Sequence, residues 1–325
     1  MEHRIVDARG TRIHCVEAGS GPLVLFVHGF PESWYSWRHQ LTAVAEAGFR
    51  AVAIDVRGYG RSSAPPEIAA YGMLEHVSDN LGVVEAFVGP EASVAIVGHD
   101  WGSPIAAHSA LLRPDVFTAV AMLSVPYNPP GIRRPTDAFA EMGEAASRVT
   151  GQEEEFYISY FQQPGRAERE IERDVRSWLL RFYVGEGARS PDGGTVATVP
   201  KGKMMLDRVP VPDELPSWLS EADLDFYVEE FERTGFAGAL NRYRNVDRDW
   251  QDFKPWRHQP IRVPALFIGG ENDGPTIWGA RAISRFPETL PDLRGSHILA
   301  GGGHWLQQER AEEVNRILID WLTSL

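Results

Sequence analysis

The stretch Gly98-His99-Asp100-Trp101-Gly102 decides the fold of this 325-residue chain. It directly follows an apolar run from Ser93 to Val97 and directly precedes a helical pattern that runs from Ile105 to Leu112. A strand, a sharp turn and a helix in that order are typical of a nucleophile elbow, a turn so tight that small residues are needed two before and two after the nucleophile. The two glycines meet this requirement. A Gly-x-Asp-x-Gly string alone also arises by chance, but its flanks favour Asp100 as a nucleophile.

The aspartate at the centre of this turn indicates the chemistry. An ionised carboxylate at a helix N-terminus is favoured by the unpaired N–H groups there, so we expect Asp100 to remain charged and nucleophilic without a base. Its attack on an sp³ carbon gives an alkyl ester that water can cleave at the carbonyl carbon, whereas a serine would leave a stable ether. The residue therefore favours alkylating substrates such as epoxides or organohalides over acyl esters.

Strand and helix signals on both sides of the turn predict an α/β fold. Short apolar runs at 23–27, 51–54, 93–97 and 119–123 alternate with stretches long enough for crossover helices, which is typical of a mostly parallel sheet with helices on both faces. The segment from Thr11 to Val16 alternates and predicts an antiparallel edge. Strand patterns return at 261–268 and weakly at 296–299, before an amphipathic C-terminal helix. We predict eight strands in total.

The strand signal is missing between Tyr127 and Arg248, where the sequence becomes aromatic, charged and helical. Ser220 is a plausible N-cap, and apolar residues follow at helical spacing from Leu224. We predict an all-helical cap at 128–248, inserted after the sixth strand of a core formed by 1–127 and 249–325. The Gly/Pro-rich stretch from Gly185 to Pro216 is too long for an ordinary connector, so we expect a lid loop or a partly mobile segment.

A base and a carboxylate follow later strands. His304, in Gly301-Gly302-Gly303-His304-Trp305, comes after the last predicted strand and is the candidate general base. Asp273 follows the strand at 261–268, and it completes the order nucleophile, acid, histidine. Glu271 is the alternative acid. The other acid position of such folds, near 124–130, holds Asn128 and no carboxylate.

The remaining histidines near these motifs receive other roles. We expect packing roles for His14 and His108, and supporting positions beside the site for His28 and His99. The stretch His28-Gly29-Phe30-Pro31 follows the third strand, where a second oxyanion-hole N–H is expected. Phe30 and Trp101 are the candidate backbone donors, each typically worth about 3 to 4 kcal/mol to the tetrahedral anion. A simple Gly-Pro turn is the alternative, but four motifs in the right order favour a site.

These motifs together resemble the soluble epoxide hydrolases of the α/β-hydrolase fold, and the resemblance covers nearly the whole chain. The segment from Asp55 to Ser62 also fits that family. Within the predicted cap, Tyr160-Phe161-Gln162-Gln163-Pro164-Gly165 is similar to the family signature Tyr-Phe-Gln-x-Pro-Gly. Likewise, Asn241-Arg242-Tyr243-Arg244 is similar to its Asn-Trp-Tyr-Arg segment.

The resemblance implies that Tyr160 and Tyr243 hydrogen-bond the epoxide oxygen and protonate the leaving alkoxide. An alkoxide leaves poorly unless acid is supplied in the transition state, and tyrosine supplies it without a competing charge. Buried packing is the usual role of a cap tyrosine, so only the motif match selects these two. Arg242 stands where the family usually has tryptophan. The resemblance therefore does not determine the shape of the neighbouring pocket wall or of the substrate it admits.

Two other functions share parts of this pattern. A dehalogenase also uses an aspartate nucleophile and a cap, but it stabilises halide with tryptophan, asparagine or a cap histidine, and the sequence 127–248 contains no histidine. The fluoroacetate type usually carries arginine where this chain has Trp101. A non-catalytic receptor of the same fold would be marked by a degraded triad.

Composition excludes several classes of protein and partner. The chain is 43% hydrophobic and 24% charged, as in ordinary globular proteins. Its net charge is −13 and its longest basic tract is the pair Arg133-Arg134, which argues against nucleic acid and anionic membranes as partners. Cys15 is the single cysteine and cannot form an intrachain disulfide. We expect it in the core.

The N-terminal segment, the length of the apolar runs and the missing motifs predict the location, cofactors and partners of the protein. The N-terminus lacks the apolar region of a signal peptide, and no apolar run approaches about 20 residues. We therefore expect a cytoplasmic protein without a membrane-spanning segment. Nucleotide and metal motifs are missing from the sequence, so we expect no cofactor and no metal. The expected partner is a small, apolar epoxide substrate, and the sequence is compatible with a homodimer.

Overall fold

A computed structural model of the protein describes residues 1–185, 197–207, 209–212 and 214–325. The chain forms two compact units. The first comprises Met1–Ala64, Met73–Pro129 and Trp256–Leu325, and the second comprises Pro65–Gly72 and Pro130–Pro255. This division differs from the predicted core and cap by a few residues at the boundaries and by the segment 65–72, which sequence analysis assigned to the core. The loop predicted at 185–216 lies partly outside the described residues, because 186–196, 208 and 213 are not among them.

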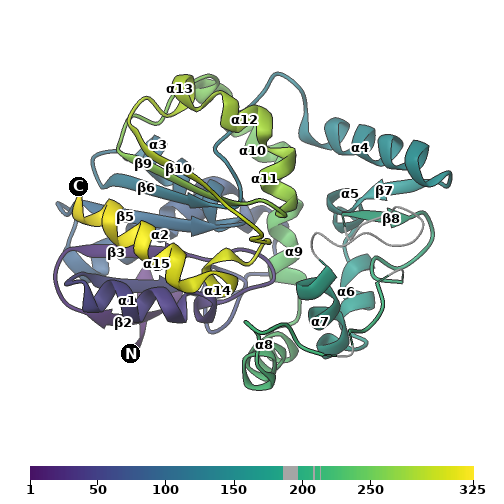
Figure 1. The fold of residues 1–325 in the computed structure, drawn as a ribbon, viewed down its shortest axis with the longest axis horizontal. Coiled ribbons are helices and arrows are strands. Elements are labelled where there is room, and N and C mark those ends of the chain that lie inside the picture. The colour runs from purple at the N-terminus through teal and green to yellow at the C-terminus, as the bar shows by residue number, and fades with distance from the viewer. Residues whose placement is uncertain (186–196, 208, 213) are drawn as a thin grey trace. The chain divides into compact units, whose positions relative to one another are not determined.

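The first unit is built on an eight-stranded sheet (Figure 1). Its strands are β1 (Glu2–Ala8), β2 (Thr11–Gly19), β3 (Leu23–Val27), β4 (Arg50–Ile54), β5 (Val94–His99), β6 (Phe117–Leu123), β9 (Ala265–Gly270) and β10 (Leu293–Leu299). They are ordered β1-β2-β4-β3-β5-β6-β9-β10. The pairs β1–β2 and β2–β4 are antiparallel, and the other pairs are parallel. The predicted parallel sheet and its antiparallel edge are confirmed.

Strand boundaries differ from the sequence prediction for simple reasons. The predicted strand at 261–268 begins only at Ala265, because Pro264 has no N–H to donate to a neighbouring strand. Strand β5 continues beyond the predicted apolar run to His99. It therefore ends immediately before Asp100. Strand β1 is largely exposed, so no apolar run marked it in the sequence.

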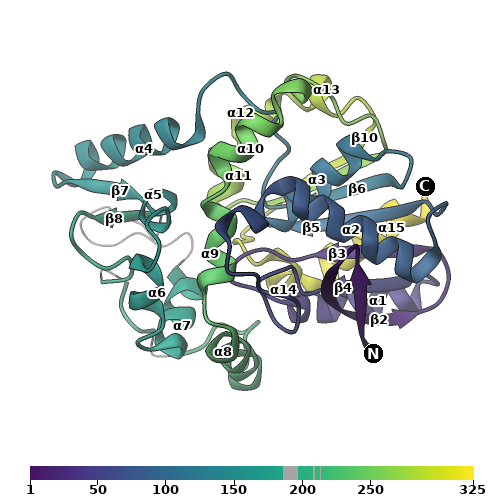
Figure 2. The same cartoon turned by 180° about the vertical axis from the view of Figure 1, so that it is seen from behind.

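Helices cover both faces of this sheet. They are α1 (Arg38–Glu46), α2 (Met73–Val88), α3 (Gly102–Leu112), α11 (Gly274–Trp278), α12 (Ala280–Ser284), α13 (Phe286–Thr289), α14 (Leu306–Glu309) and α15 (Ala311–Thr323). Helices α1 and α15 lie on the face seen in Figure 1, and α2 and α3 lie on the face seen in Figure 2. The central strands β3 and β5 are buried throughout, which explains their continuous apolar runs. The predicted amphipathic C-terminal helix is α15, which buries Val314, Ile317, Leu318 and Trp321.

The second unit is mainly helical. Its helices are α4 (Pro135–Thr150), α5 (Tyr157–Phe161), α6 (Arg166–Ile171), α7 (Val175–Gly185), α8 (Glu221–Thr234), α9 (Ala237–Tyr243) and α10 (Val246–Asp252). The predicted N-cap at Ser220 is confirmed as a capping box with Asp223. The all-helical prediction was wrong, because β7 (Glu154–Phe156) and β8 (Thr198–Pro200) form a two-stranded antiparallel sheet. Strands of three residues are too short to show a period of two in the sequence.

The register of the parallel strands aligns their carboxyl ends. Val27 of β3 pairs with Gly98 of β5. His99 pairs with Leu123 of β6, and Leu123 pairs with Ile268 of β9. Residues that directly follow these strands therefore meet at one edge of the sheet, the edge at which α/β folds usually bind ligands.

Candidate active site

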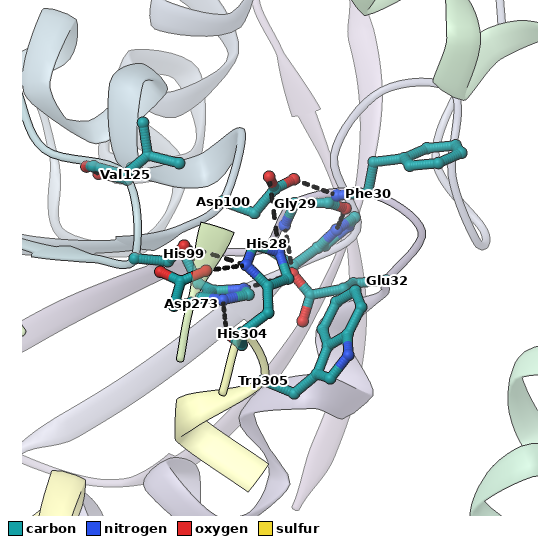
Figure 3. Close-up of polar contacts among 12 residues, drawn as sticks. His28, Gly29, Phe30, Glu32, His99, Asp100, Val125, Asp273, His304 and Trp305 are labelled. Atoms are coloured by element: carbon teal, nitrogen blue, oxygen red, sulfur yellow. Dashed lines mark hydrogen bonds and ion pairs between the residues drawn. The ribbon is translucent and has the colours of Figure 1, made fainter. Parts of the chain in front are cut away.

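The predicted residues of the first unit come together at this edge (Figure 3). Phe30 follows β3, Asp100 follows β5, Asp273 follows β9 and His304 follows β10. No two of these strands other than β9 and β10 are neighbours along the chain. The shared sheet edge is what brings their loops into contact.

Asp100 lies in a strained turn between β5 and α3. Its φ is 49°, a left-handed value that a non-glycine residue adopts only when the surrounding structure requires it. A Cβ on Gly98 would overlap the carbonyl group of Gly102, and a Cβ on Gly102 would overlap the carbonyl group of Val27. Both glycines are therefore needed for α3 to begin directly beside β3 and β5. This is the turn that the sequence predicted.

The carboxylate of Asp100 is surrounded by donors. The Phe30 N–H donates to Oδ1 at 2.7 Å, and the Trp101 N–H also interacts with the carboxylate. His304 Nε2 lies 3.8 Å from Oδ2. Burial raises the pKa of Asp100, although both histidines His304 and His99 and the two backbone N–H groups oppose that shift. Burial therefore opposes the helix N-terminus, which in the sequence favoured a charged Asp100.

His304 is oriented by Asp273. The Nδ1–H of His304 donates to Asp273 Oδ1 at 2.8 Å, so in the neutral imidazole Nε2 is the basic nitrogen. The Thr276 hydroxyl donates to the other carboxylate oxygen at 2.6 Å. Burial acts to raise the pKa of Asp273, but His304 and the hydroxyl donors outweigh it, so the pKa lies below its ordinary value. The alternative acid, Glu271, instead accepts from the Gly301 N–H at 2.8 Å.

Ser124 is a residue of this site that the sequence analysis missed. It directly follows β6, is fully buried and has a φ of 70°. Its Oγ lies 3.1 Å from His304 Nδ1, and it also hydrogen-bonds Asp273. The stretch after the sixth strand was searched only for a carboxylate, and a hydroxyl at its first position gives no comparable signal.

A buried ion pair lies beneath these loops. His99 donates through Nδ1 to Glu32 Oε2 at 2.8 Å and through Nε2 to the His304 carbonyl at 2.7 Å. Glu32 also accepts from the Gly29 N–H at 2.8 Å and from the Gln307 amide at 2.7 Å. Burial acts to raise the pKa of Glu32, but the hydrogen-bonded His99 outweighs it and the pKa is lowered to about 2. The pair therefore ties the loops after β3, β5 and β10 together.

The other predicted histidine roles agree with their contacts. His28 donates through Nδ1 to the Gly29 carbonyl at 2.8 Å and accepts the Val56 N–H at Nε2. Burial lowers the pKa of His28, which fits this neutral tautomer. His14 hydrogen-bonds Asp55 at 2.7 Å, and His108 donates to the Pro104 carbonyl. His14 and His108 therefore stabilise their own surroundings and do not contact Asp100, Asp273 or the His304 ring through these hydrogen bonds.

Tyr160, in the second unit, makes a hydrogen bond that argues against its predicted role. Its hydroxyl donates to Glu170 Oε2 at 2.5 Å, and Glu170 also accepts the backbone N–H groups of Met205 and Leu206. The ring is buried, and the Arg166 guanidinium lies over it at 4.0 Å. Burial and the Glu170 carboxylate both raise the pKa of Tyr160. A phenol in this position anchors the 205–206 backbone through Glu170.

Tyr243, the second predicted donor, lies beside a different tyrosine. Its ring makes an edge contact with Tyr157, with 6.0 Å between ring centroids, and another with Phe161 at 5.0 Å. Tyr157 and Phe161 share one face of α5 because they are four residues apart. Tyr157 is half-buried, unlike Tyr160. The sequence analysis missed it, because the matched signature begins at Tyr160.

Arg242, which stands where the family usually has tryptophan, makes its contacts within the second unit. It is buried, and its guanidinium donates to the Tyr71 carbonyl and pairs with Asp249. Tyr71 belongs to the segment 65–72, which the sequence analysis placed in the core. This arginine therefore holds that segment to the helices α9 and α10.

In the part of the chain that the structure describes, no three His, Cys, Asp or Glu side chains are placed to hold a metal ion. Among the same residues, no helix is both long enough and apolar enough to cross a membrane.

Comparisons with known proteins agree on one family. Residues 22–184 match the family described as alpha/beta hydrolase fold. Epoxide hydrolase B of Mycobacterium tuberculosis (strain ATCC 25618 / H37Rv) is 43% identical over 359 aligned residues, covering 99% of this chain and 98% of the relative. A structure of an epoxide hydrolase from an endophytic Streptomyces matches with a TM-score of 0.92 and 60% identity, covering 99% of this chain and 95% of that one. Epoxide hydrolase A from Mycobacterium thermoresistibile matches with a TM-score of 0.89 and 42% identity, covering 99% and 98%.

Proposed function

The chain belongs to the epoxide hydrolases of the alpha/beta hydrolase fold, and from that premise we propose that it converts small, apolar epoxides to vicinal diols in two steps. The observation that carries this proposal is the surroundings of Asp100. One carboxylate oxygen accepts the Phe30 N–H at 2.7 Å, and the other lies 3.8 Å from the His304 ring that Asp273 orients.

In the first step an Asp100 oxygen attacks a ring carbon of the epoxide. The carbon–oxygen bond of the ring breaks, an alkyl ester forms, and the leaving oxygen takes a proton from a tyrosine hydroxyl. Tyr243 and Tyr157 fit this role as a pair, because their rings contact each other. Tyr160 fits it less well, because its hydroxyl already donates to Glu170.

In the second step water cleaves the ester. His304 Nε2 takes a proton from water, and the resulting hydroxide attacks the carbonyl carbon of the ester. Negative charge then develops on the carbonyl oxygen, where the backbone N–H groups of Phe30 and Trp101 stabilise it. Collapse of this anion breaks the bond between the carbonyl carbon and the alkoxide oxygen, and the protonated His304 gives its proton to that oxygen as the diol leaves. The proton left on the Asp100 carboxyl group returns to the tyrosinate formed in the first step, which restores the carboxylate.

The test is product formation from a panel of terminal and trans-disubstituted epoxides, with halide release from matched organohalides measured alongside. We expect diol without halide, and no diol from the Asp100→Ala variant. Halide without diol would replace this proposal with a dehalogenase. Neither product, together with ligand binding by the folded protein, would indicate a receptor.

A cytoplasmic location and a homodimer belong to the same proposal. A single, buried cysteine suits a reducing compartment. Fractionation of the native cells tests the location, and light scattering of the purified protein tests the dimer. A monomer at micromolar concentration would remove the dimer from the proposal.

A further inference from the structure

The two helices that carry Tyr157 and Tyr243 are unusually short. Helix α5 has five residues and α9 has seven. A helix leaves its last four carbonyl groups without partners inside the helix, so most carbonyls of α5 and α9 need other donors. Helices this short are not stable by themselves. Their positions must be set by side chains outside them.

The residue that follows each helix supplies a donor to the other helix. Gln162 follows α5, and its amide donates at 2.9 Å to the carbonyl of Tyr243, the last residue of α9. Arg244 follows α9, and its Nε donates at 3.0 Å to the carbonyl of Phe161, the last residue of α5. The same Gln162 amide also donates to the Ile158 carbonyl at 3.1 Å. We call this reciprocal arrangement the cap lock.

Arg244 has further partners that fix its plane. Its Nη1 donates to Asn241 Oδ1 at 2.9 Å, and its Nη2 donates to Glu168 Oε1 at 2.8 Å. The side chains of Arg244 and Glu168 are only 4% and 11% exposed. A guanidinium places its donors in a rigid fork, which a lysine ammonium cannot reproduce. The direction of the Nε donor toward Phe161 is therefore set by the rest of the side chain.

We propose that Gln162 and Arg244 are positioning residues for the ring-opening step, because the cap lock holds Tyr157 and Tyr243 as one pair of proton donors. The inference rests on the proposed function of that pair. Gln162 binds the backbone of Tyr243 itself, and Arg244 binds the backbone one helical turn after Tyr157, at the Phe161 whose ring contacts Tyr243. Two hydroxyls that share one leaving oxygen need placement within a fraction of an ångström. The ring-opening rate should therefore depend on the lock more than the ester hydrolysis rate does.

The experiment compares Gln162→Glu, Arg244→Lys and the double variant with the parent enzyme. Glutamate has nearly the shape of glutamine but cannot donate to the Tyr243 carbonyl. Gln163→Glu is the matched control, because this neighbouring side chain is exposed and the substitution adds the same charge. Arg233→Lys on α8, whose side chain is 49% exposed, is the control for the arginine. Gln162→Met carries the test if the glutamate variant folds poorly.

Rapid-quench single-turnover kinetics, normalised to titrated active sites, measure ring opening and ester hydrolysis separately. We expect ring opening to slow by about 10-fold or more in each single variant, because small misplacements of catalytic groups have effects of this size. Ester hydrolysis should stay within about twofold. The double variant should be little slower than the slower single variant, because both side chains act on the same pair. A structural role alone would lower the number of active sites and leave both rates unchanged.

Tyr243→Phe separates the two proposals. Slow ring opening in Tyr243→Phe together with parental ring opening in the lock variants would overturn the positioning role and leave the proposed function standing. Parental ring opening in Tyr243→Phe would overturn the tyrosine role and the cap lock together. Equal slowing of ring opening and ester hydrolysis in the lock variants would also overturn the inference.

Discussion

The two units place their candidate residues by different means. In the first unit Asp100 and Asp273 follow strands of one parallel sheet within a few residues, so backbone pairing fixes them before any side chain contributes. In the second unit Tyr157 and Tyr243 lie on helices of five and seven residues that side chains join. Many apolar residues along the strands determine where the sheet places a catalytic residue. In the second unit, single side chains that form hydrogen bonds determine where the tyrosines lie.

This difference predicts where substitutions act. Changes at Asp100 should affect both chemical steps, because this residue forms the ester and carries it, whereas changes at His304 and Asp273 should affect ester hydrolysis alone. Changes in the second unit should affect ring opening alone. The following experiments test that division, beginning with the largest expected effect.

The His304→Gln variant should separate the two steps most clearly. Asp100 needs no base for its attack, so the variant should still accept one equivalent of epoxide, while turnover falls by about four orders of magnitude or more. Intact-mass spectra should show one added substrate on the protein, and Asp100→Ala should show none. An unmodified His304→Gln protein would contradict the two-step scheme.

The Asp273→Asn variant should have a smaller effect of the same kind. The histidine loses the carboxylate 2.8 Å from Nδ1 but keeps the Ser124 hydroxyl at 3.1 Å. We expect ester hydrolysis to fall by about 100- to 1,000-fold, somewhat less than for the loss of the acid in other triads. Glu271→Gln is the control and should stay within about twofold of the parent. A slow ester hydrolysis in Glu271→Gln together with a parental rate in Asp273→Asn would make Glu271 the orienting acid.

Tyrosine variants test the second unit. Tyr157→Phe should slow ring opening by about 10- to 100-fold, which is the lower part of the range for a general acid because Tyr243 remains. Tyr160→Phe should leave ring opening nearly unchanged, since its hydroxyl serves Glu170. Single-turnover rates measure both effects. A slow Tyr160→Phe variant with a parental Tyr157→Phe variant would restore the role that the sequence motif predicts for Tyr160.

The sequence predicts the first unit well because its signals are repeated. Each of the buried strands β3, β4, β5 and β6 is a continuous apolar run, and Phe30 and Asp100 follow two of these runs. His304 follows the weaker strand β10, where the glycine loop gives the signal instead. Once the order of the strands is known, their register brings Phe30, Asp100 and His304 to one edge. The strand predicted at 261–268 begins instead at Ala265, because Pro264 has no N–H to donate to a neighbouring strand.

The second unit was harder to predict because its signals are local. Tyr157 and Tyr160 are three residues apart on one short helix, so a motif selects the region but not the residue. The choice depends on which ring contacts Tyr243 and which hydroxyl contacts Glu170, and neither contact has a pattern in the sequence. The same reason applies to Arg242, whose partner Tyr71 lies 171 residues away.

The last prediction concerns stability instead of rate, and it tests a side-chain contact within the first unit, the ion pair of Glu32 and His99. The pKa of Glu32 is lowered from 4.5 to about 2 in the folded protein. A carboxyl group whose pKa is lower in the folded state than in the unfolded state stabilises the fold at any pH above the unfolded-state pKa. This stability is lost as the pH falls from the unfolded-state pKa to the folded-state pKa. Between pH 4.5 and pH 2 the parent should therefore lose about 3 kcal/mol of unfolding free energy that Glu32→Gln does not lose.

Urea unfolding at a series of pH values measures this difference, with Glu46→Gln, which removes an exposed carboxylate, as the control. The parent and control curves should run parallel, and the Glu32→Gln curve should be lower at neutral pH and flatter on acidification. Parallel curves for all three proteins would mean that the pair with His99 contributes nothing to stability. The sheet alone would then position the loops that carry Gly29 and His304. Side-chain contacts would then position candidate residues in the second unit only.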